Sequence, residues 1–111
     1  MAFDEMLAER IRDALGPDRA DATEKKMFGG LAFLISGNMA VAAAREGGLL
    51  ARVDKDDAPN LLRRNAVEPM VMGGREMHGW LRVTPAAIAD DATLEEWVRR
   101  SVNFARTLPP K

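Results

Sequence analysis

Residues 77–83, MHGWLRV, bring together the side chains of this chain that most resemble a small binding site. Their polarity alternates as in a β-strand, which places His78, Trp80 and Arg82 on one face. An imidazole, an indole and a guanidinium on one face could hold an anionic or planar ligand. We therefore consider a small-molecule-binding or enzymatic pocket there. The competing interpretation of His78 is a polar residue on a partly exposed face, since acid–base catalysis also requires an orienting carboxylate and a substrate pocket.

Methionine is unusually frequent, with 7 residues in the chain. A thioether metal site normally combines clustered methionines with cysteine or histidine, and this chain has no cysteine and a single histidine. We therefore predict no metal site, and most methionines are expected to fill the core. A partner-binding surface is the other possibility, because Met70, Met72, Trp80 and Arg82 are residue types enriched at protein interfaces.

Two further patterns resemble catalytic motifs only superficially. The lysine pair at 25–26 precedes the glycine pair at 29–30, whereas the lysine of a phosphate-binding loop follows its glycines and opens a helix. Glycines inside a strand more often let another backbone or a large ring come close. The carboxylate pairs at 56–57, 90–91 and 95–96 fall at or near expected helix starts, where capping and the helix dipole explain them. We predict no catalytic residues, no cofactor and no enzymatic activity.

Composition narrows the class of protein. The chain has 111 residues, 47% of them hydrophobic and 30% charged, which suits a single domain over residues 1–111. Its 16 Lys and Arg against 17 Asp and Glu lack the basic excess expected of a direct nucleic-acid binder. The N-terminal segment is acidic and amphipathic, and no run approaches the roughly 18 apolar residues of a membrane span. We expect a cytoplasmic protein that does not cross a membrane.

The elements that would position these residues follow from the apolar pattern. Residues 25–38, KKMFGGLAFLISGN, predict a central strand covered on both faces, followed by a hairpin turn at 36–38. Residues 39–44 form the returning strand, and residues 49–53, LLARV, predict a third. These strands should form an antiparallel meander.

Helical spacing predicts a first helix over residues 4–15, a short middle helix within 54–65, and a long last helix. Residues 68–72 predict a fourth strand, which Pro69 confines to a strand start or a sheet edge. In the last helix, Thr93 and Glu96 stand at the spacing of a capping box. Its expected buried stripe comprises Leu94, Trp97, Val98, Ser101, Val102, Ala105 and Leu108. The order α-β-β-β-α-β-β-α indicates an α+β fold with an antiparallel sheet of about five strands.

Several separated segments together resemble the TfoX N-terminal domain family. They are FDEMLAERIR, TEKKMFGGLAFLISGNM, LLARV, GREMHGWLRV and LEEWVRRSVNFARTLPPK. The resemblance implies an antiparallel sheet of about five strands packed with helices, in a secretion-chaperone-like arrangement. TfoX/Sxy proteins regulate competence-gene transcription in bacteria and are thought to act through another transcription factor. The resemblance therefore implies a protein partner, and it supplies no catalytic residues.

These observations favour a small non-enzymatic protein that acts by protein–protein contact in transcriptional regulation. The alternative is the small-molecule-binding or enzymatic pocket near His78, Trp80 and Arg82. Direct DNA binding through three arginines of the last helix is the least favoured hypothesis, because a solvated helix face explains them equally well. Those arginines are Arg99, Arg100 and Arg106.

The apolar strands also predict self-association. Residues 27–35 and 39–44 are apolar at both alternating sets of positions, so both faces of the sheet should be shielded from water. The first and last helices can cover one face, but the middle helix offers only Leu61 and Leu62. Part of the second face is then left for a partner, and we predict a symmetric homodimer. The competing account is a monomer, in which the middle helix and small residues such as those at 42–44 suffice.

Overall fold

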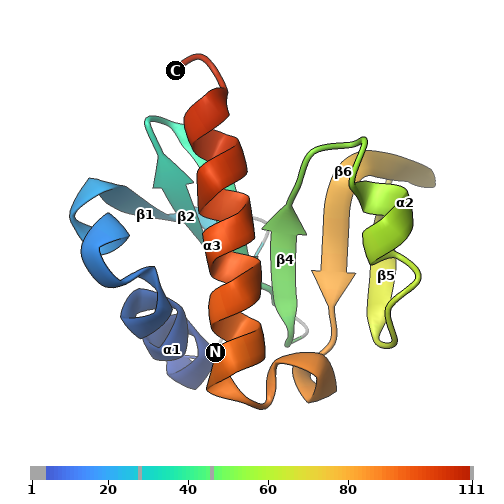
Figure 1. Cartoon of the computed structure of the whole chain (residues 1–111), viewed down its shortest axis with the longest axis horizontal. Helices are drawn as coiled ribbons and strands as arrows, with labels where there is room; N and C mark the ends of the chain where they lie inside the picture. Colours follow the sequence, from blue (N-terminus) through green and yellow to red (C-terminus); the bar gives the residue numbers. More distant parts are fainter. Residues whose placement is uncertain (1–4, 28, 46, 111) are drawn as a thin grey trace.

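The computed structural model describes residues 5–27, 29–45 and 47–110, apart from the side chain of Met72, and confirms the α+β class (Figure 1). The elements in chain order are α1 (Glu5–Leu15), the 3₁₀ helix η1 (Gly16–Asp21), β1 (Ala22–Met27), β2 (Gly30–Ile35), β3 (Asn38–Ala43), β4 (Leu49–Arg52), α2 (Ala58–Leu61), β5 (Val67–Met72), β6 (Arg75–Val83), the 3₁₀ helix η2 (Pro85–Ile88) and α3 (Asp91–Thr107). None of the helices within these ranges has both the length and the apolar content needed to cross a bilayer.

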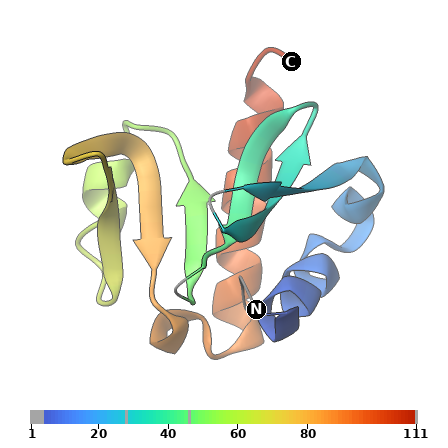
Figure 2. The same cartoon turned by 180° about the vertical axis from the view of Figure 1, so that it is seen from behind.

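The strands form one antiparallel sheet, seen from its far side in Figure 2. Its six strands follow the order β1-β2-β3-β4-β6-β5, so the described residues form one strand more than the expected number. The outer strands are β1 and β5. Pro69 therefore lies in an edge strand, as its missing N–H donor led us to expect.

The additional strand corrects the prediction of one continuous strand over residues 25–38. Residues 22–27 instead form β1, which pairs with β2 in a register that sets Lys25 opposite Ala32 and Met27 opposite Gly30. Between these strands Gly29 has a φ of +78°, a conformation that glycine adopts without a Cβ penalty. The glycine pair therefore lies where the chain turns and β2 begins, and of these two strands β2 is the buried one.

The next turn has the geometry that the sequence predicted. Ser36 and Gly37 have φ values of +52° and +83°, and the chain returns as β3, antiparallel to β2. Asn38 opens β3 and is buried at 2% exposure. Its Nδ2 donates a hydrogen bond to the carbonyl oxygen of Pro109 at 2.9 Å. This bond ties the hairpin to the segment that follows α3.

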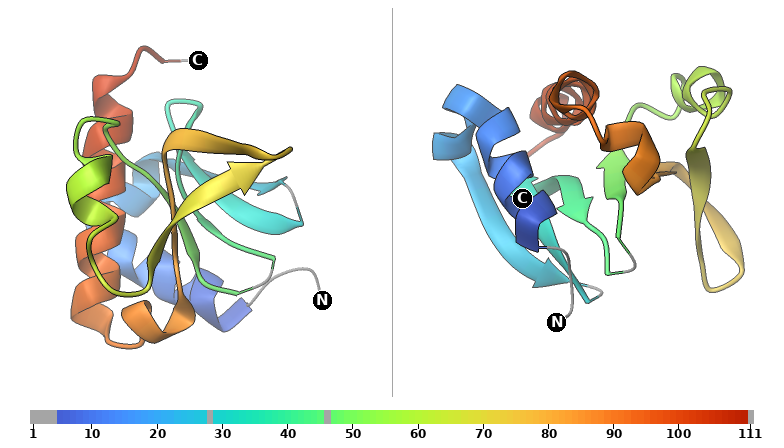
Figure 3. Two further views of the ribbon diagram at one scale, coloured as in Figure 1. Left: turned by 90° about the vertical axis from the view of Figure 1, so that its right-hand side faces the viewer. Right: turned by 90° about the horizontal axis from the view of Figure 1, so that it is seen from below.

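The helices all lie on one face of the sheet (Figure 3). Helix α3 packs against α1 and against β2, β3 and β4, and α2 contacts β6. Six of the seven residues of the expected α3 stripe are buried, and the seventh, Leu108, is half-buried. Because Asp90 Oδ2 accepts the backbone N–H of Thr93 at 2.9 Å, Asp90 is the N-cap and the predicted capping box at Thr93 and Glu96 is wrong.

Helix α2 is shorter than expected, with 4 residues, and it lies on the same side as the longer helices. Its Leu61 belongs to the same buried cluster as Trp97 of α3 and Leu81 of β6, while Leu62 packs partly buried against that cluster. Neither leucine therefore covers the second face. Among the described residues, no helix lies on that face of the sheet (Figure 2).

Candidate functional site

The face of the sheet opposite the helices, called here the helix-free face, is concave. Viewed from below in Figure 3, the β1–β2 end and the β5–β6 end both bend away from the helices. Between them lies a small apolar cluster whose buried members are Ala32, Met39, Ala42 and Leu50. Leu50 is only 8% exposed although no described helix covers it. The curved sheet therefore buries these side chains together with the partly buried residues that pack against them, namely Met27, Leu34, Met70 and Trp80.

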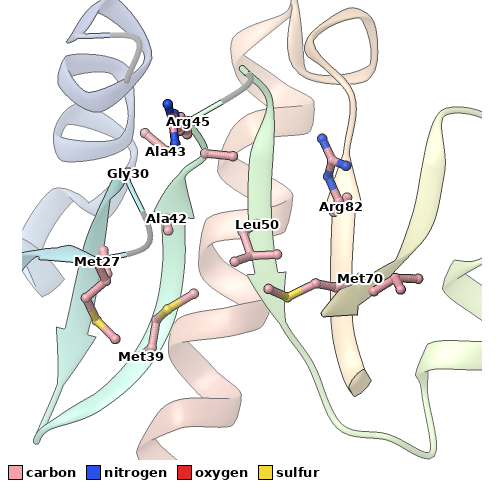
Figure 4. A pocket seen from close by; sticks show the side chains of 12 residues that line it. Met27, Gly30, Met39, Ala42, Ala43, Arg45, Leu50, Met70 and Arg82 are labelled. Carbon is pink, nitrogen blue, oxygen red and sulfur yellow. The ribbon is translucent and has the colours of Figure 1, made fainter. Parts of the chain in front are cut away.

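A cavity of about 180 Å³ opens on this face, and we call it the hollow (Figure 4). Small residues from β2 and β3 form its floor, namely Gly30, Ala32 and Ala42; larger side chains surround them, namely Met27, Met39, Leu50 and Met70. Arg45 and Arg82 both lie toward the same end of the hollow, but on opposite sides of it (Figure 4). The hollow is thus apolar along its length and cationic at one end.

Close contact between β2 and β3 shapes the floor. A Cβ placed on Gly30 would lie 2.3 Å from the carbonyl oxygen of Ala43, a separation that real Cβ atoms do not tolerate. This confirms the interpretation that a glycine of the pair lets another backbone come close. A larger residue at position 30 would either push β3 away or change the shape of the hollow.

The two arginines are positioned by different parts of the sheet. The stem of Arg45 lies over the β1–β2 turn, since a Cβ on Gly29 would come within 2.7 Å of Arg45 Cδ. Arg82 stands on β6, opposite Leu50 of β4 and Glu68 of β5. It also takes part in an interaction within the chain. Both arginines line the hollow, and since Arg45 is exposed and Arg82 half-buried, water has access to this end.

The structure brings only some of the predicted site residues together. Met70 and Arg82 line the hollow, and Trp80 packs partly buried against its apolar cluster. The guanidinium of Arg52 lies over the Trp80 ring, 5.0 Å from its centre, and therefore occupies one face of the indole. His78 is exposed on β6 and is not among the residues described as lining the hollow. The side chain of Met72 falls outside the described part of the chain.

Several residues of the hollow were not singled out from the sequence. They are Met27, Met39, Arg45 and Leu50. Met27 lies within the expected central strand and Met39 follows it directly, and small residues at 42–44 come next in β3 and the turn after it. Large flexible side chains next to a run of alanines are a signal for a hollow, because the alanines leave space that neighbouring methionines line.

The charges on the helix side of the molecule are largely paired with one another. Arg12 donates two hydrogen bonds to Glu24, at 2.6 and 2.7 Å, and this contact lowers the pKa of the Glu24 carboxyl. Arg106 contacts Asp18 at 2.6 Å and Asp21 at 3.0 Å.

Pairing also extends to the wider depression along α3. That depression, of about 490 Å³, is lined by Glu96, Arg99 and Arg100 among others, and Arg100 contacts Glu96 at 3.4 Å. Two of the three arginines proposed for DNA binding, Arg100 and Arg106, therefore have acidic partners. In the part of the chain that is described, no group of three or more His, Cys, Asp or Glu residues could hold a metal ion.

Comparison with known proteins gives one match. The family model of the TfoX N-terminal domain matches residues 13–105, which is most of the chain. No curated protein and no solved structure matches it. The matched residues include every part of the hollow.

Proposed function

Because the chain belongs to the TfoX N-terminal domain family, we propose that it acts by binding another protein and not by catalysing a reaction. The family resemblance points to transcriptional regulation, in the cytoplasm that the sequence led us to expect. The observation that carries the proposal is the hollow in the helix-free face. It offers a partner apolar surface that lies outside the main core of the chain.

The chemistry of this surface suits protein contact. A concave, mostly apolar site with a few charged groups at its edge is the usual form of a binding site. The side chains of Met27, Met39 and Met70 can adjust their shape to a partner, because methionine is flexible and polarizable. Val71, at the rim, is 57% exposed and extends the apolar surface toward the β5–β6 turn.

Small-molecule binding is the second candidate, and the presence of Arg82 and Met70 in the same hollow supports it. Sites for drug-sized ligands usually have volumes of roughly 300–1,000 Å³. The hollow, at about 180 Å³, is smaller than that range. We therefore favour a protein partner. A thermal-shift screen of metabolites would support the second candidate if a compound raises the melting temperature and Arg82→Gln abolishes the shift.

A pair of variants tests the proposal. Ala42 is 6% exposed and faces the hollow, so Ala42→Arg should obstruct it with a side chain long enough to reach water. Ala92→Arg adds the same group on the exposed first turn of α3 as a matched control. Circular dichroism would first establish that both variants fold.

The tagged proteins would then be used to recover partners from extract of the native cell. We expect the wild type and Ala92→Arg to recover the same specific protein and Ala42→Arg to lose it. Recovery of that protein by all three would contradict a role of the hollow. Recovery of no protein, with a small metabolite co-purifying instead, would overturn the proposal.

A further inference from the structure

We propose that the hollow binds a large apolar side chain from an acidic segment of the partner, and that Arg45 and Arg82 bind carboxylates of the same segment. This inference rests on the proposed function and specifies the chemistry of the partner. It combines the size of the hollow, the lining of its walls and the position of its charges. Each of these excludes a different class of occupant.

The size of the hollow matches one large side chain. A cavity of roughly 150 Å³ lined by aliphatic and aromatic groups in another protein accommodates benzene. At about 180 Å³, this hollow has room for a Leu, Met or Phe side chain, but not for a compact domain surface or a whole cofactor. An extended or helical peptide that inserts one anchoring side chain fits this geometry.

The charges select an acidic segment. Of the described residues that line the hollow, the charged ones are Arg45 and Arg82, both at the same end. A guanidinium can bind a carboxylate through two parallel N–H donors, and it has five donors in total. Arg82 can therefore contact a partner carboxylate while it keeps its contact within the chain.

The acids of β5 and β6 do not reverse this preference. Glu68 lies opposite Arg82, and Glu76 lies opposite Val71 toward the β5–β6 turn. Neither carboxylate belongs to the described lining of the hollow. The chain as a whole carries a formal charge of −1, so the cationic end is a local feature and not a consequence of overall composition.

Two other occupants fit less well. A second copy would present the same hollow, whose described lining has two arginines and no acid, so it offers these arginines no carboxylate. A single-stranded nucleic acid would need aromatic rings on which its bases stack and a cationic track for its backbone. The described lining of the hollow contains no aromatic ring, and its cations occupy one end only.

The test uses the full ¹⁵N-labelled chain and four terminally blocked octapeptides. The first has Leu-Phe flanked by Asp and Glu, and the second replaces these acids by Asn and Gln. The third keeps the acids but replaces Leu-Phe by Ser-Ser, and the fourth flanks Leu-Phe with Lys. We expect only the first peptide to shift the backbone amide signals of Ala32, Ala42 and Leu50, which lie at the hollow.

Variants then assign the contacts. We expect Arg45→Gln to weaken binding of the first peptide about tenfold, because a hydrogen bond between charged groups is lost. Ala42→Phe should fill the hollow and abolish binding, while retained dispersion of the amide spectrum shows that the chain is folded. Arg99→Gln, on the exposed surface of α3, is the matched control and should leave the affinity unchanged.

The outcomes separate this inference from the proposal on which it rests. Equal binding of the Asn/Gln peptide, or no effect of Arg45→Gln, would overturn the acidic partner. The acidic partner would also be overturned if the amide signals of the hollow shift with the Lys peptide, on dilution of a dimer, or with a single-stranded oligonucleotide. Of these, the Lys peptide or the dimer would still leave the helix-free face as a protein contact surface. If no peptide shifts the hollow and cellular partners bind Ala42→Arg normally, both ideas fail.

Discussion

Substitution of Gly30 by alanine tests the contact on which the shape of the hollow depends. The new Cβ would lie 2.3 Å from the carbonyl oxygen of Ala43 and 3.4 Å from its carbonyl carbon. An ordinary van der Waals contact would place the Cβ about 1 Å farther from that oxygen. The oxygen belongs to the backbone of the paired strand β3, which cannot move aside as a flexible side chain can. One strand must therefore shift.

Overpacking of this kind lowers the free energy of unfolding by about 1–3 kcal/mol. Alanine also restricts the unfolded chain, which raises the free energy of unfolding by about 0.4–1 kcal/mol and offsets part of this loss. We therefore expect a net loss of about 1–2 kcal/mol, which corresponds to a decrease in melting temperature of about 4–8 °C for a domain of this size. Urea unfolding followed by the fluorescence of Trp97, which is 1% exposed, measures it.

Gly73→Ala is the matched control for this experiment. Gly73 has a φ of +61° and open space around it, so alanine there meets backbone strain of about 1 kcal/mol but no clash. At Gly30 the φ is not in the left-handed region, and the loss arises from the clash alone. A Gly30→Ala protein that unfolds at the same urea concentration as the wild type would refute the close approach of β3 to β2.

Three further predictions concern the paired charges, the core and self-association. The pKa of Glu24 is lowered in the folded chain, so its pairing with Arg12 stabilises the fold above the unfolded pKa of about 4.3, and this stabilisation is lost as the pH falls through the folded pKa. Glu24→Gln should therefore lower the free energy of unfolding by about 0.5 kcal/mol at pH 7 and by less at pH 3. An equal loss at both pH values would contradict the ion pair. The buried hydroxyl of Ser101 has no hydrogen-bond partner among the described residues, so Ser101→Ala should raise the free energy of unfolding by about 1 kcal/mol in urea, and a clear loss would reveal a partner. The homodimer stays a prediction that light scattering after size exclusion checks, and a mass near 12.2 kDa at every concentration would rule it out.

The sequence predicted those parts of the fold that have a strong local pattern. The stripe of α3 was correct because seven apolar or small residues recur at helical spacing, and the hairpin at Ser36 and Gly37 was correct because these residues tolerate positive φ. Strand β1 was missed because its residues Ala22–Met27 are mostly polar and exposed. An edge strand of this kind has no apolar alternation that distinguishes it from a loop.

The hollow could be predicted only in part, because it depends on residues from most of the sheet. Met70 and Arg82 were identified by residue type, but nothing local relates them to Arg45 or to Met27. Their proximity results from the strand order and from the curvature of the sheet. The sequence also could not predict which face of the sheet α2 covers, because Leu61 could have packed against either face.

The packing of α3 has a consequence for the synthesis of the protein. Residues Asp91–Thr107 supply Trp97 and Val98 to the main core, while the strands that they cover are translated first. At about 5–20 residues per second, the apolar inner face of the meander remains without its cover for several seconds during translation. A chaperone that binds nascent chains has this interval in which to act. Variants that weaken α3 should therefore reduce the yield of folded protein in cells more than their equilibrium stability suggests.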